Sequence, residues 1–222
     1  MSILTTELFD LTKTLSAPLL QECPYPWEAL PQIGDFIIKT GPLLDKNIYE
    51  DKGDNVWIAK SVKMHSSAVV RGPTIISENT EIRPSAFIRG NVIIGSNCVI
   101  GNSCELKNSI VFDNVQIPHF NYIGDSILGY CSHTGAGAIT SNVKSDRSLV
   151  TISNNGKKIE TGLKKFGAMI GDYVEIGCNC VLNPGSIIGR NTNIYPLSSV
   201  RGTIPPNSIF KSSENIVKKT TN

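Results

Sequence analysis

Basic residues recur at an interval of 18 residues in this 222-residue sequence, at Arg71, Arg89 and Lys107. The same interval aligns a second set of four residues: His65, Arg83, Gly101 and His119. Cations stacked in this way suit a phosphate group, because Arg and Lys side chains donate charge-assisted hydrogen bonds to its oxygens. A solvent-exposed corner that merely carries charges is the alternative, and the ladder alone leaves both interpretations open.

An internal repeat of six residues underlies this interval. Aliphatic or aromatic residues fill every sixth position in two runs: Ile58, Met64, Val70, Ile76, Ile82, Ile88, Ile94, Ile100, Leu106 and Phe112, then Ile170, Ile176, Leu182, Ile188, Ile194 and Val200. A helix would repeat about every 3.6 residues and a half-buried strand about every 2. A period of six instead fits short strands separated by tight turns, three to a coil of 18 residues, with Gly, Asn or Asp in the turns.

This pattern resembles the hexapeptide-repeat acyltransferases, which fold as a left-handed parallel β-helix. The left hand is implied by the resemblance alone, since the general rule for parallel crossovers favours the right hand. We therefore expect a mainly β protein with 18 residues per coil, a short N-terminal extension and an inserted hairpin loop. Members of this family are characteristically trimers, so we also expect a homotrimer.

Three segments lie outside the repeat. Residues 1–54 are predicted to be a partly helical extension or connector, with a candidate helix in "TTELFDLTKTLS". The β-helix domain is predicted over 55–205 and contains an insertion, 141–168, in which "LVTISNNGKKIET" indicates a hairpin turning at Asn155-Gly156. Residues 206–222 are a short polar and basic tail, which we expect to be loosely ordered.

The six-residue rhythm fails near His119. The aliphatic position falls on Pro118, and the next recognisable steps, Ile123 and Leu128, are each five residues further on. A repeat that breaks its own pattern without local need marks a candidate functional site. A harmless deletion near a loop is the alternative.

A more specific resemblance rests on "CELKNSIVFDNVQIPHFNYIGDSILG" (104–129) followed by "TGAGAITSN" (134–142). These segments resemble the acetyltransferase half of the bifunctional enzyme that makes UDP-N-acetylglucosamine, in its archaeal-type versions. The similarity extends over roughly residues 75–205 and includes "KKFGAMIGDYVEIG" after the insertion. It implies acetyl-CoA as co-substrate, no required metal, and an amino-sugar 1-phosphate as acceptor, glucosamine 1-phosphate first and galactosamine 1-phosphate second.

The same resemblance implies roles for individual residues. His119 matches the general base, and Glu105 matches the carboxylate that orients it. Matches to residues that bind the sugar or its phosphate are Arg89, Lys107, Tyr122, Asn142 and Lys165, with Lys144 as a competitor of Lys165.

Ala136 and Cys178 match positions that hold the pantetheine arm of acetyl-CoA against the next subunit. The chain departs from the bacterial form of the family at His133 and Val143, where that form has asparagine and tyrosine. We expect His133 to be a further substrate contact, and both departures leave the identity of the amino sugar open.

The chemistry expected of these residues is direct acetyl transfer. An attacking amine must lose a proton, and a histidine titrates in the range suited to accept it. Backbone N–H groups at Gly135 and Gly137 could stabilise the oxyanion. No acyl-enzyme is required, and we expect Cys98, Cys104 and Cys180 to be core residues because they occupy the small-residue position of the repeat, whereas Cys178 should face outward.

Two further functions were considered for such a β-helix. A zinc hydratase resembling the γ-class carbonic anhydrases would need His65, His119 and His133 to converge, although His65 lies about three coils from His119. A non-catalytic structural or regulatory subunit, associated with a separate sugar nucleotidyltransferase, would not need the motif residues named above. Nucleotidyltransferase activity is not expected in this chain, because it has no Gly-rich G-x-G-T-R loop.

Composition limits the remaining possibilities. Twenty-one basic against 19 acidic residues give a net charge of +2, unlike the basic stripe of a nucleic-acid-binding protein. No apolar run approaches the about 20 residues of a membrane span, and the N-terminus lacks the pattern of a signal peptide. Six cysteines without a secretion signal favour a reducing compartment, so we expect the cytoplasm.

Overall fold

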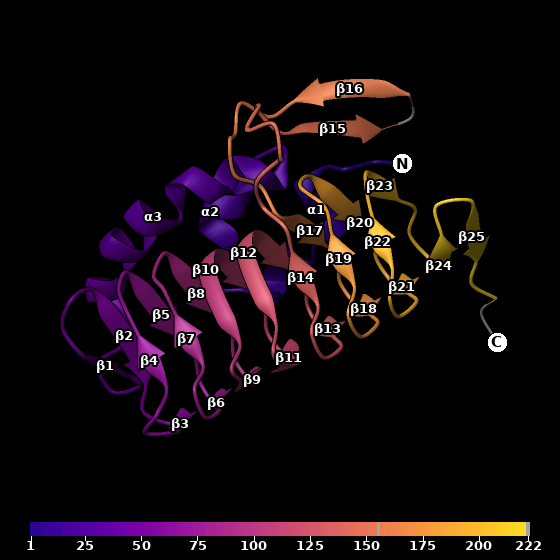
Figure 1. The fold of residues 1–222 in the computed structure, drawn as a ribbon. Coiled ribbons are helices and arrows are strands. Elements are labelled where there is room, and N and C mark those ends of the chain that lie inside the picture. Colours follow the sequence, from indigo (N-terminus) through magenta and orange to yellow (C-terminus); the bar gives the residue numbers. More distant parts are fainter. Residues whose placement is uncertain (155, 221–222) are drawn as a thin grey trace.

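The chain winds into a triangular coil of short parallel strands, with a helical layer at its N-terminal half (Figure 1). This computed structural model describes residues 1–154 and 156–220. The predicted class, a mainly β parallel β-helix with about 18 residues per coil, is confirmed: Ile58, Ile76 and Ile94 are register partners in successive strands.

The coil has three faces, which we call face 1, face 2 and face 3. Face 1 stacks β2 (Val56–Ala59), β5 (Thr74–Ile76), β8 (Val92–Ile94), the second halves of β10 (Glu105–Val111) and β12 (Tyr122–Leu128), β17 (Ala168–Ile170), β20 (Ser186–Ile188) and β23 (Thr203–Ile204).

Face 3 follows face 1 along each coil and face 2 closes it. Face 3 stacks β3 (Lys63–Met64), β6 (Glu81–Ile82), β9 (Val99–Asn102), β11 (Gln116–His119), β13 (His133–Thr134), β18 (Glu175–Ile176), β21 (Asn193–Ile194) and β24 (Ser208–Ser212). Face 2 stacks β4 (Val69–Val70), β7 (Phe87–Ile88), the first halves of β10 and β12, β14 (Ile139–Thr140), β19 (Val181–Leu182) and β22 (Ser199–Val200), toward the viewer in Figure 1.

Register shows that one of the two short steps in the six-residue rhythm lies at a different place from the one predicted. The inward residues of the fourth coil are Val111 and Ile117, which pair with Ile94 and Ile100, so Phe112 and Pro118 are not the inward positions. The five-residue steps run from 106 to 111 and from 123 to 128, both at the corner between face 2 and face 1. The predicted five-residue step from 123 to 128 is therefore confirmed, whereas the step predicted at His119, from 118 to 123, is wrong because the other short step lies two corners earlier.

This lost residue also changes what His119 stacks on. His119 pairs with Asn102, not with Gly101 as a count of 18 predicts. The basic ladder is unaffected, because the N–H groups of Arg71 and Arg89 bond the next coil at Ile88 and Leu106, and the loss comes only after Lys107. At the shortened corner Asn108 and Asp125 have φ of +48°, a left-handed conformation that Asn and Asp tolerate.

The N-terminal extension forms a layer that covers face 1. Its elements are α1 (Thr5–Leu8), η1 (Leu11–Lys13), α2 (Ala17–Gln21), η2 (Pro26–Gln32), α3 (Ile33–Thr40), η3 (Gly41–Leu43) and β1 (Tyr49–Asp51), which pairs antiparallel with β2. The single candidate helix in 5–16 is thus two short helical turns, interrupted at Phe9, whose ring packs 5.2 Å from that of Phe112. Contacts of α3 with β5, β8 and β10, and of η2 with β12, place the layer on face 1.

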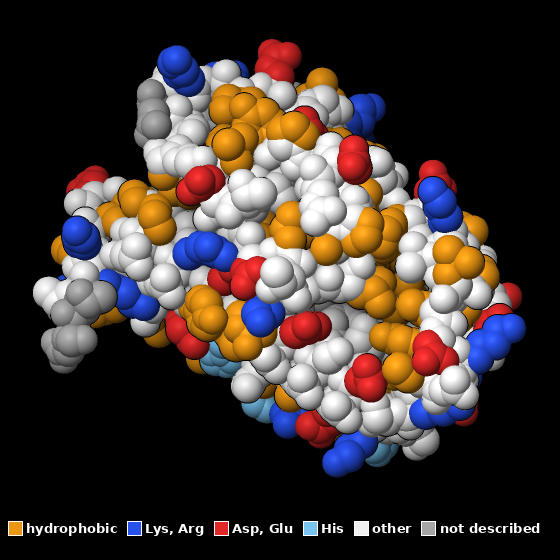
Figure 2. Space-filling model, turned by 180° about the vertical axis from the view of Figure 1, so that it is seen from behind, with side chains coloured by type: hydrophobic (Ala, Val, Ile, Leu, Met, Phe, Trp, Pro, Cys, Tyr) orange, Lys and Arg blue, Asp and Glu red, His pale blue; other side chains and the backbone are white. Residues whose placement is uncertain are grey.

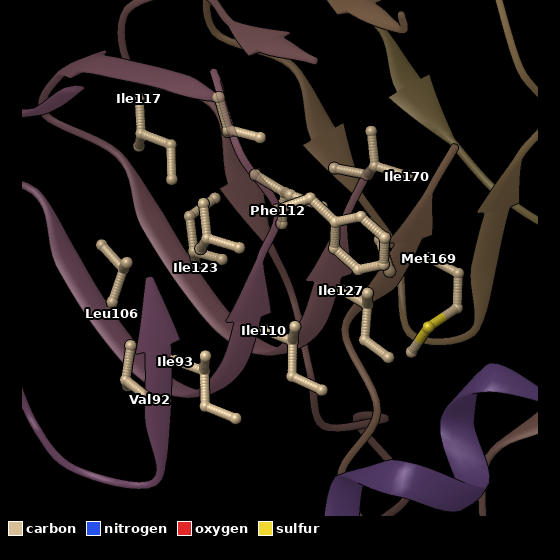
Figure 3. Packing of buried hydrophobic residues seen from close by; sticks show 14 of the residues in the cluster. Val92, Ile93, Leu106, Ile110, Phe112, Ile117, Ile123, Ile127, Met169 and Ile170 are labelled. Carbon is tan, nitrogen blue, oxygen red and sulfur yellow. The ribbon is translucent and has the colours of Figure 1, made fainter. Parts of the chain in front are cut away.

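Face 1 is buried on both sides, which explains its sequence. Its strands read as continuous apolar runs because the inward residues fill the prism and the outward residues meet the helical layer. The outward set is fully buried: Ile75, Ile93, Ile110, Ile127, Met169 and Ile187. Figure 3 shows Ile93, Ile110, Ile127 and Met169 in a row between the strands and a helix, with Leu106, Ile117 and Ile123 on the other side.

The insertion and the C-terminus each form an antiparallel hairpin. β15 (Thr151–Asn154) and β16 (Lys157–Glu160) confirm the hairpin in the insertion, although Asn155 of the predicted turn lies outside the described residues. The expectation of a loosely ordered tail is wrong for 208–218, because β25 (Asn215–Lys218) folds back on β24 and covers the last open edge of face 3. None of the described helices is long and apolar enough to cross a membrane.

Candidate functional site

Face 2 carries a polar cluster on its outer side, in the coils around β10 and β12. Leu106 and Ile123 point inward and pair with each other, so Glu105 and Tyr122 project outward side by side. Lys107 follows on the same face, opposite Gly124. Strand alternation thus brings together three of the residues that the motif singles out.

The first part of the cluster is an ion pair. Nη1 of Arg89 lies 2.7 Å from Oε1 of Glu105, one coil away. This hydrogen bond raises the pKa of Arg89 above its ordinary value. Both side chains remain substantially open to water, so we attribute positioning rather than much stability to the pair.

Asp125 organises the second part. This carboxylate is only 3% exposed and accepts hydrogen bonds from Asn108 Nδ2 at 2.9 Å and Asn142 Nδ2 at 2.5 Å. Lys107 Nζ lies 3.3 Å from its Oδ2 atom. The buried charge therefore has three partners, as a buried carboxylate requires.

Tyr122 joins the two parts through Asn142. The amide Nδ2 of Asn142 also donates to the Tyr122 hydroxyl at 3.2 Å. Burial, followed by the charge of Asp125, raises the pKa of Tyr122, so its phenol remains protonated at neutral pH and can donate a hydrogen bond. Sequence reasoning assigned roles to Tyr122 and Asn142 but not to Asp125. The signal was present, because Asp125 lies within the quoted segment 104–129 and at a five-residue step.

His119 lies at the corner between face 3 and face 2. Its side chain is exposed, and its backbone carbonyl accepts a hydrogen bond from Gly137 N–H at 3.0 Å. Among the described residues, none hydrogen-bonds the imidazole. Glu105, predicted to orient this ring, is instead bonded to Arg89. The predicted Glu105–His119 contact is therefore absent from this chain's own structure.

The insertion brings Lys165 next to the cluster. The N–H of Phe166 donates to the carbonyl of Asn142 at 2.9 Å, so the backbone of Lys165 lies beside that residue. Lys165 is exposed and has no side-chain partner among the described residues. Its competitor Lys144 is held within its own loop by Ser148 Oγ at 2.5 Å and Asp146 Oδ2 at 3.6 Å. The geometry favours Lys165 over Lys144 as the lysine free to reach a ligand at Asn142.

His133 lies on face 3, apart from this cluster. Its Nδ1 atom is 2.8 Å from Oε2 of Glu175, and both line a shallow cavity of about 320 Å³ together with Gly135, Cys178 and Tyr195. The structure thus groups His133 with the predicted cofactor position Cys178 and not with Tyr122 and Asn142. Ala136 does not line this cavity but follows Gly135 at the corner, where its carbonyl accepts a hydrogen bond from Asn179 N–H at 2.8 Å.

Cysteines and histidines offer no alternative site within the chain. Cys98, Cys104 and Cys180 are buried, Cys178 is exposed, and burial raises the pKa of Cys98 to about 12. In the part of the chain that is described, no group of three or more His, Cys, Asp or Glu side chains is placed to hold a metal ion. His119 and His133 lie in β11 and β13 of face 3, and His65 directly follows β3.

Two family models match the β-helix. Residues 69–163 match a GMPPB C-terminal domain, and residues 167–202 match six repeats of the bacterial transferase hexapeptide. The predicted resemblance is confirmed by curated relatives. The "Bifunctional protein GlmU" of Methanococcus vannielii is 39% identical over 111 residues, which is 50% of this chain and 27% of that protein. Its counterpart in Methanococcus aeolicus is 36% identical over 200 residues, 82% of this chain and 48% of that protein.

Other similar proteins have less identity but comparable length. An uncharacterized acetyltransferase, YaiX, from Escherichia coli O6:K15:H31 is 29% identical over 210 residues, 89% of this chain and 91% of that protein. The crystal structure of UDP-N-acetylglucosamine O-acyltransferase (LpxA) from Moraxella catarrhalis RH4 is 14% identical, covers 73% of this chain and 71% of that chain, and has a TM-score of 0.44. The chain thus spans at most about half the length of the bifunctional relatives named here.

Proposed function

We propose that this chain transfers the acetyl group of acetyl-CoA to the amine of an amino-sugar 1-phosphate. Glucosamine 1-phosphate is the first choice of acceptor and galactosamine 1-phosphate the second. The observation that carries the proposal is the gathering of Arg89, Lys107, Tyr122 and Asn142 on one face, between the His119 corner and the insertion. The similarity to the GlmU proteins, over up to 82% of the chain, supports the reaction class.

His119 would act as the general base. As the sugar nitrogen attacks the thioester carbonyl, the N–C bond forms and the nitrogen gives a proton to the imidazole. Collapse of the tetrahedral intermediate breaks the C–S bond, and the proton leaves with CoA as its thiol. The exposed imidazole, free of hydrogen bonds from the described residues, is available for both transfers.

The phosphate would be held by Arg89, through exchange of its exposed partner Glu105, and by Lys107, which keeps its contact with the buried Asp125. Arg89 and Lys107 are each paired with a carboxylate, and the side chain of Arg89 is 43% exposed. A doubly charged phosphate can compete with a single solvent-exposed carboxylate, because an exposed ion pair contributes only about 0–1 kcal/mol. Release of Glu105 from Arg89 would free that carboxylate to turn toward His119, the role that the resemblance implies.

A second copy of the chain would complete the site. Phe120 and Leu197, at the corner between face 3 and face 2, are 61% and 79% exposed, and the cavity beside Cys178 is shallow. Such exposed apolar corners and a half-formed groove fit a homotrimer in which a neighbouring face covers the pantetheine arm of acetyl-CoA. Ala136 and Cys178 would line that arm.

A non-catalytic subunit is the second candidate. The neutralisation of both cations by carboxylates favours it. In that case the chain would support a separate sugar nucleotidyltransferase, and the polar cluster on face 2 would be structural.

The deciding experiment measures release of free thiol from acetyl-CoA with a panel of amino sugars, each with and without a 1-phosphate. We expect turnover with an amino-sugar 1-phosphate and at least about 100-fold less with the unphosphorylated sugar, because the phosphate supplies the charge-assisted bonds that position the amine. Absence of turnover with every acceptor would reject the transferase and favour the structural subunit. Equal turnover with and without phosphate would reject the roles of Arg89 and Lys107.

A further inference from the structure

A basic groove lies between the inserted hairpin and the last coils of the prism. This cavity has a volume of about 390 Å³, within the range of small-ligand sites. Its cationic lining comes from both sides: Lys144, Lys157, Lys158 and Arg201. Thr151, Ser153, Gly156, Pro184, Gly185 and Gly202 complete the lining. Figure 1 shows the hairpin, β15 and β16, standing over the side of the prism that carries β20 and β23, and β15 contacts β23.

The walls of the groove are held in place by packing. Val150 and Ile152 at the base of the hairpin are fully buried. Gly185 has φ of +81°, and a Cβ atom at that position would lie 2.9 Å from Val150 Cγ1. The hairpin therefore docks on a corner where only glycine leaves room. Thr203 Oγ1 also donates to the carbonyl of Ser153 at 3.2 Å.

Positive charge in the groove is largely uncompensated. Lys157, Lys158 and Arg201 have no acidic partner among the described residues, and Arg201 Nη2 contacts only the amide oxygen of Asn183 at 3.3 Å. Asp146 pairs with Lys144 at 3.6 Å and is the one carboxylate bonded to a lining cation. No carboxylate lines the cavity itself. Three unpaired cations facing one concave space raise the local concentration of anions.

The groove continues toward the polar cluster of face 2. A second cavity of about 360 Å³ shares Lys144, Pro184 and Arg201 with it and reaches Ser141 and Val143. Asn142, which bonds Tyr122 and Asp125, lies between those last two residues. Asp146, the partner of Lys144, is the one carboxylate that lines this second cavity. One extended ligand could thus have one end at Asn142 and its charged groups along Lys144, Arg201 and Lys158.

We infer that this groove binds the phosphate groups of a nucleotide. Clustered Lys and Arg side chains bind phosphate oxygens through charge-assisted hydrogen bonds, and the two cavities are joined through Lys144, Pro184 and Arg201. The inference goes beyond the proposed acetyl transfer where the nucleotide is a nucleoside-diphosphate sugar, and it rests on that proposal where the nucleotide is the adenosine end of CoA. The nucleotide has two possible sources: a nucleoside-diphosphate sugar, or the phosphorylated adenosine end of CoA.

Isothermal titration of the full chain tests the inference without measuring turnover. UDP and adenosine 3′,5′-bisphosphate are the probes, uridine and adenosine are their uncharged controls, and Lys158→Ala and Arg201→Ala are compared with Lys39→Ala on the helical layer. We expect at least one phosphorylated probe to bind, its affinity to fall at least about tenfold in the two groove variants, and Lys39→Ala to be unaffected. Circular dichroism establishes that all variants are folded, and Arg201→Lys should retain most of the affinity.

The two sources separate in this experiment. Binding of UDP alone supports a nucleoside-diphosphate sugar, and binding of the bisphosphate alone supports the end of CoA. Failure of both probes to bind, or affinities that Lys158→Ala and Arg201→Ala leave unchanged, would overturn the inference. Because the readout is binding, its failure leaves the acetyl-transfer proposal standing, and a chain that binds nucleotide without turnover would leave this inference standing.

Discussion

Face 1 and face 2 are built from the same repeat but have opposite outer surfaces. Both turn large aliphatic residues inward, and their strands stack in the same parallel register. On face 1 the outward residues, such as Ile93 and Ile110, are fully buried by the N-terminal layer. On face 2 the matching outward residues include Glu105 and Tyr122, which form the polar cluster. The inward position of each hexapeptide therefore builds the prism, and the outward position decides what that face does.

Face 2 also differs from the opposite side of the molecule in how its charged side chains are paired. On the side opposite to the view of Figure 1, acidic and basic side chains are interspersed with small hydrophobic patches (Figure 2). Around β10 and β12 the charges are instead organised in two specific contacts, Arg89 with Glu105 and Lys107 with Asp125. Such contacts, one of them partly buried, restrict the side chains to defined positions, as a binding site requires.

Truncation of one outward isoleucine on each face should give the largest contrast. Ile110→Ala on face 1 should lower the free energy of unfolding by about 2–5 kcal/mol, because it leaves a cavity under α3. Ile139→Ala on face 2, where the residue is 40% exposed, should cost less than about 1 kcal/mol. Denaturant titrations of both variants measure the difference. A large loss at Ile139 would show that face 2 is also covered, by a second copy of the chain.

Removal of the histidine at the edge of face 2 should abolish function but not folding. His119→Ala should lower kcat for acetyl transfer by about 100-fold or more, because no other base replaces it. His65→Ala, an exposed histidine in the first coil of face 3, is the matched control and should retain full activity. Initial-rate measurements with saturating acetyl-CoA decide the outcome. Unchanged activity in His119→Ala would remove the base assignment.

Neutralisation of the buried carboxylate should have a smaller effect on acceptor binding. Asp125→Asn removes the charge that fixes Lys107 and Asn142, so KM for the sugar phosphate should rise about tenfold, the size expected for one lost charge-assisted bond. KM for acetyl-CoA should stay constant. Asp113→Asn, at a different corner, is the control. Equal changes in both KM values would indicate a general loss of structure.

The smallest expected effect is on cysteine labelling, which should distinguish the exposed Cys178 from the buried Cys98. Cys178 should react readily at pH 8, and bound acetyl-CoA should slow it a few-fold. Because burial raises the pKa of Cys98 to about 12, the folded protein should keep that thiol protonated and unreactive up to pH 10. Labelling followed by mass spectrometry of peptides measures each site. Labelling of Cys98 before Cys178 would contradict the assignment of inward and outward positions.

Sequence reasoning succeeded where the structure depends on local spacing. The six-residue period predicted the parallel coil, the core positions of Cys98, Cys104 and Cys180, and the outward side of Cys178. It also kept Arg71, Arg89 and Lys107 in one column, because no residue is lost between them. The hairpin of the insertion followed from its alternation and turn residues.

Sequence reasoning failed where residues in two successive coils had to be aligned although one coil is shorter than the other. Because the corner at Asn108 is one residue shorter, the register partner of His119 is Asn102 and not Gly101. The amino-acid sequence alone does not show which corner of a coil lacks the residue. His133 pairs with Glu175 across 42 residues of sequence, because the insertion does not disturb the stacking of the coils that flank it. The partners of Asp125 likewise come from separate coils and from the insertion.

The sequence by itself therefore determined the prism, since a hexapeptide period fixes how each strand turns its side chains and where each corner falls. The outward isoleucines of face 1 are also visible in the sequence, but the sequence does not show what covers them. Only the tertiary structure decided that the N-terminal layer covers this face, that Asp125 joins Lys107 to Asn142, and that the hairpin closes a basic groove. The physical reason is distance along the chain: local conformation depends on neighbouring residues, whereas these contacts depend on which coils stack and on how much chain each corner contains.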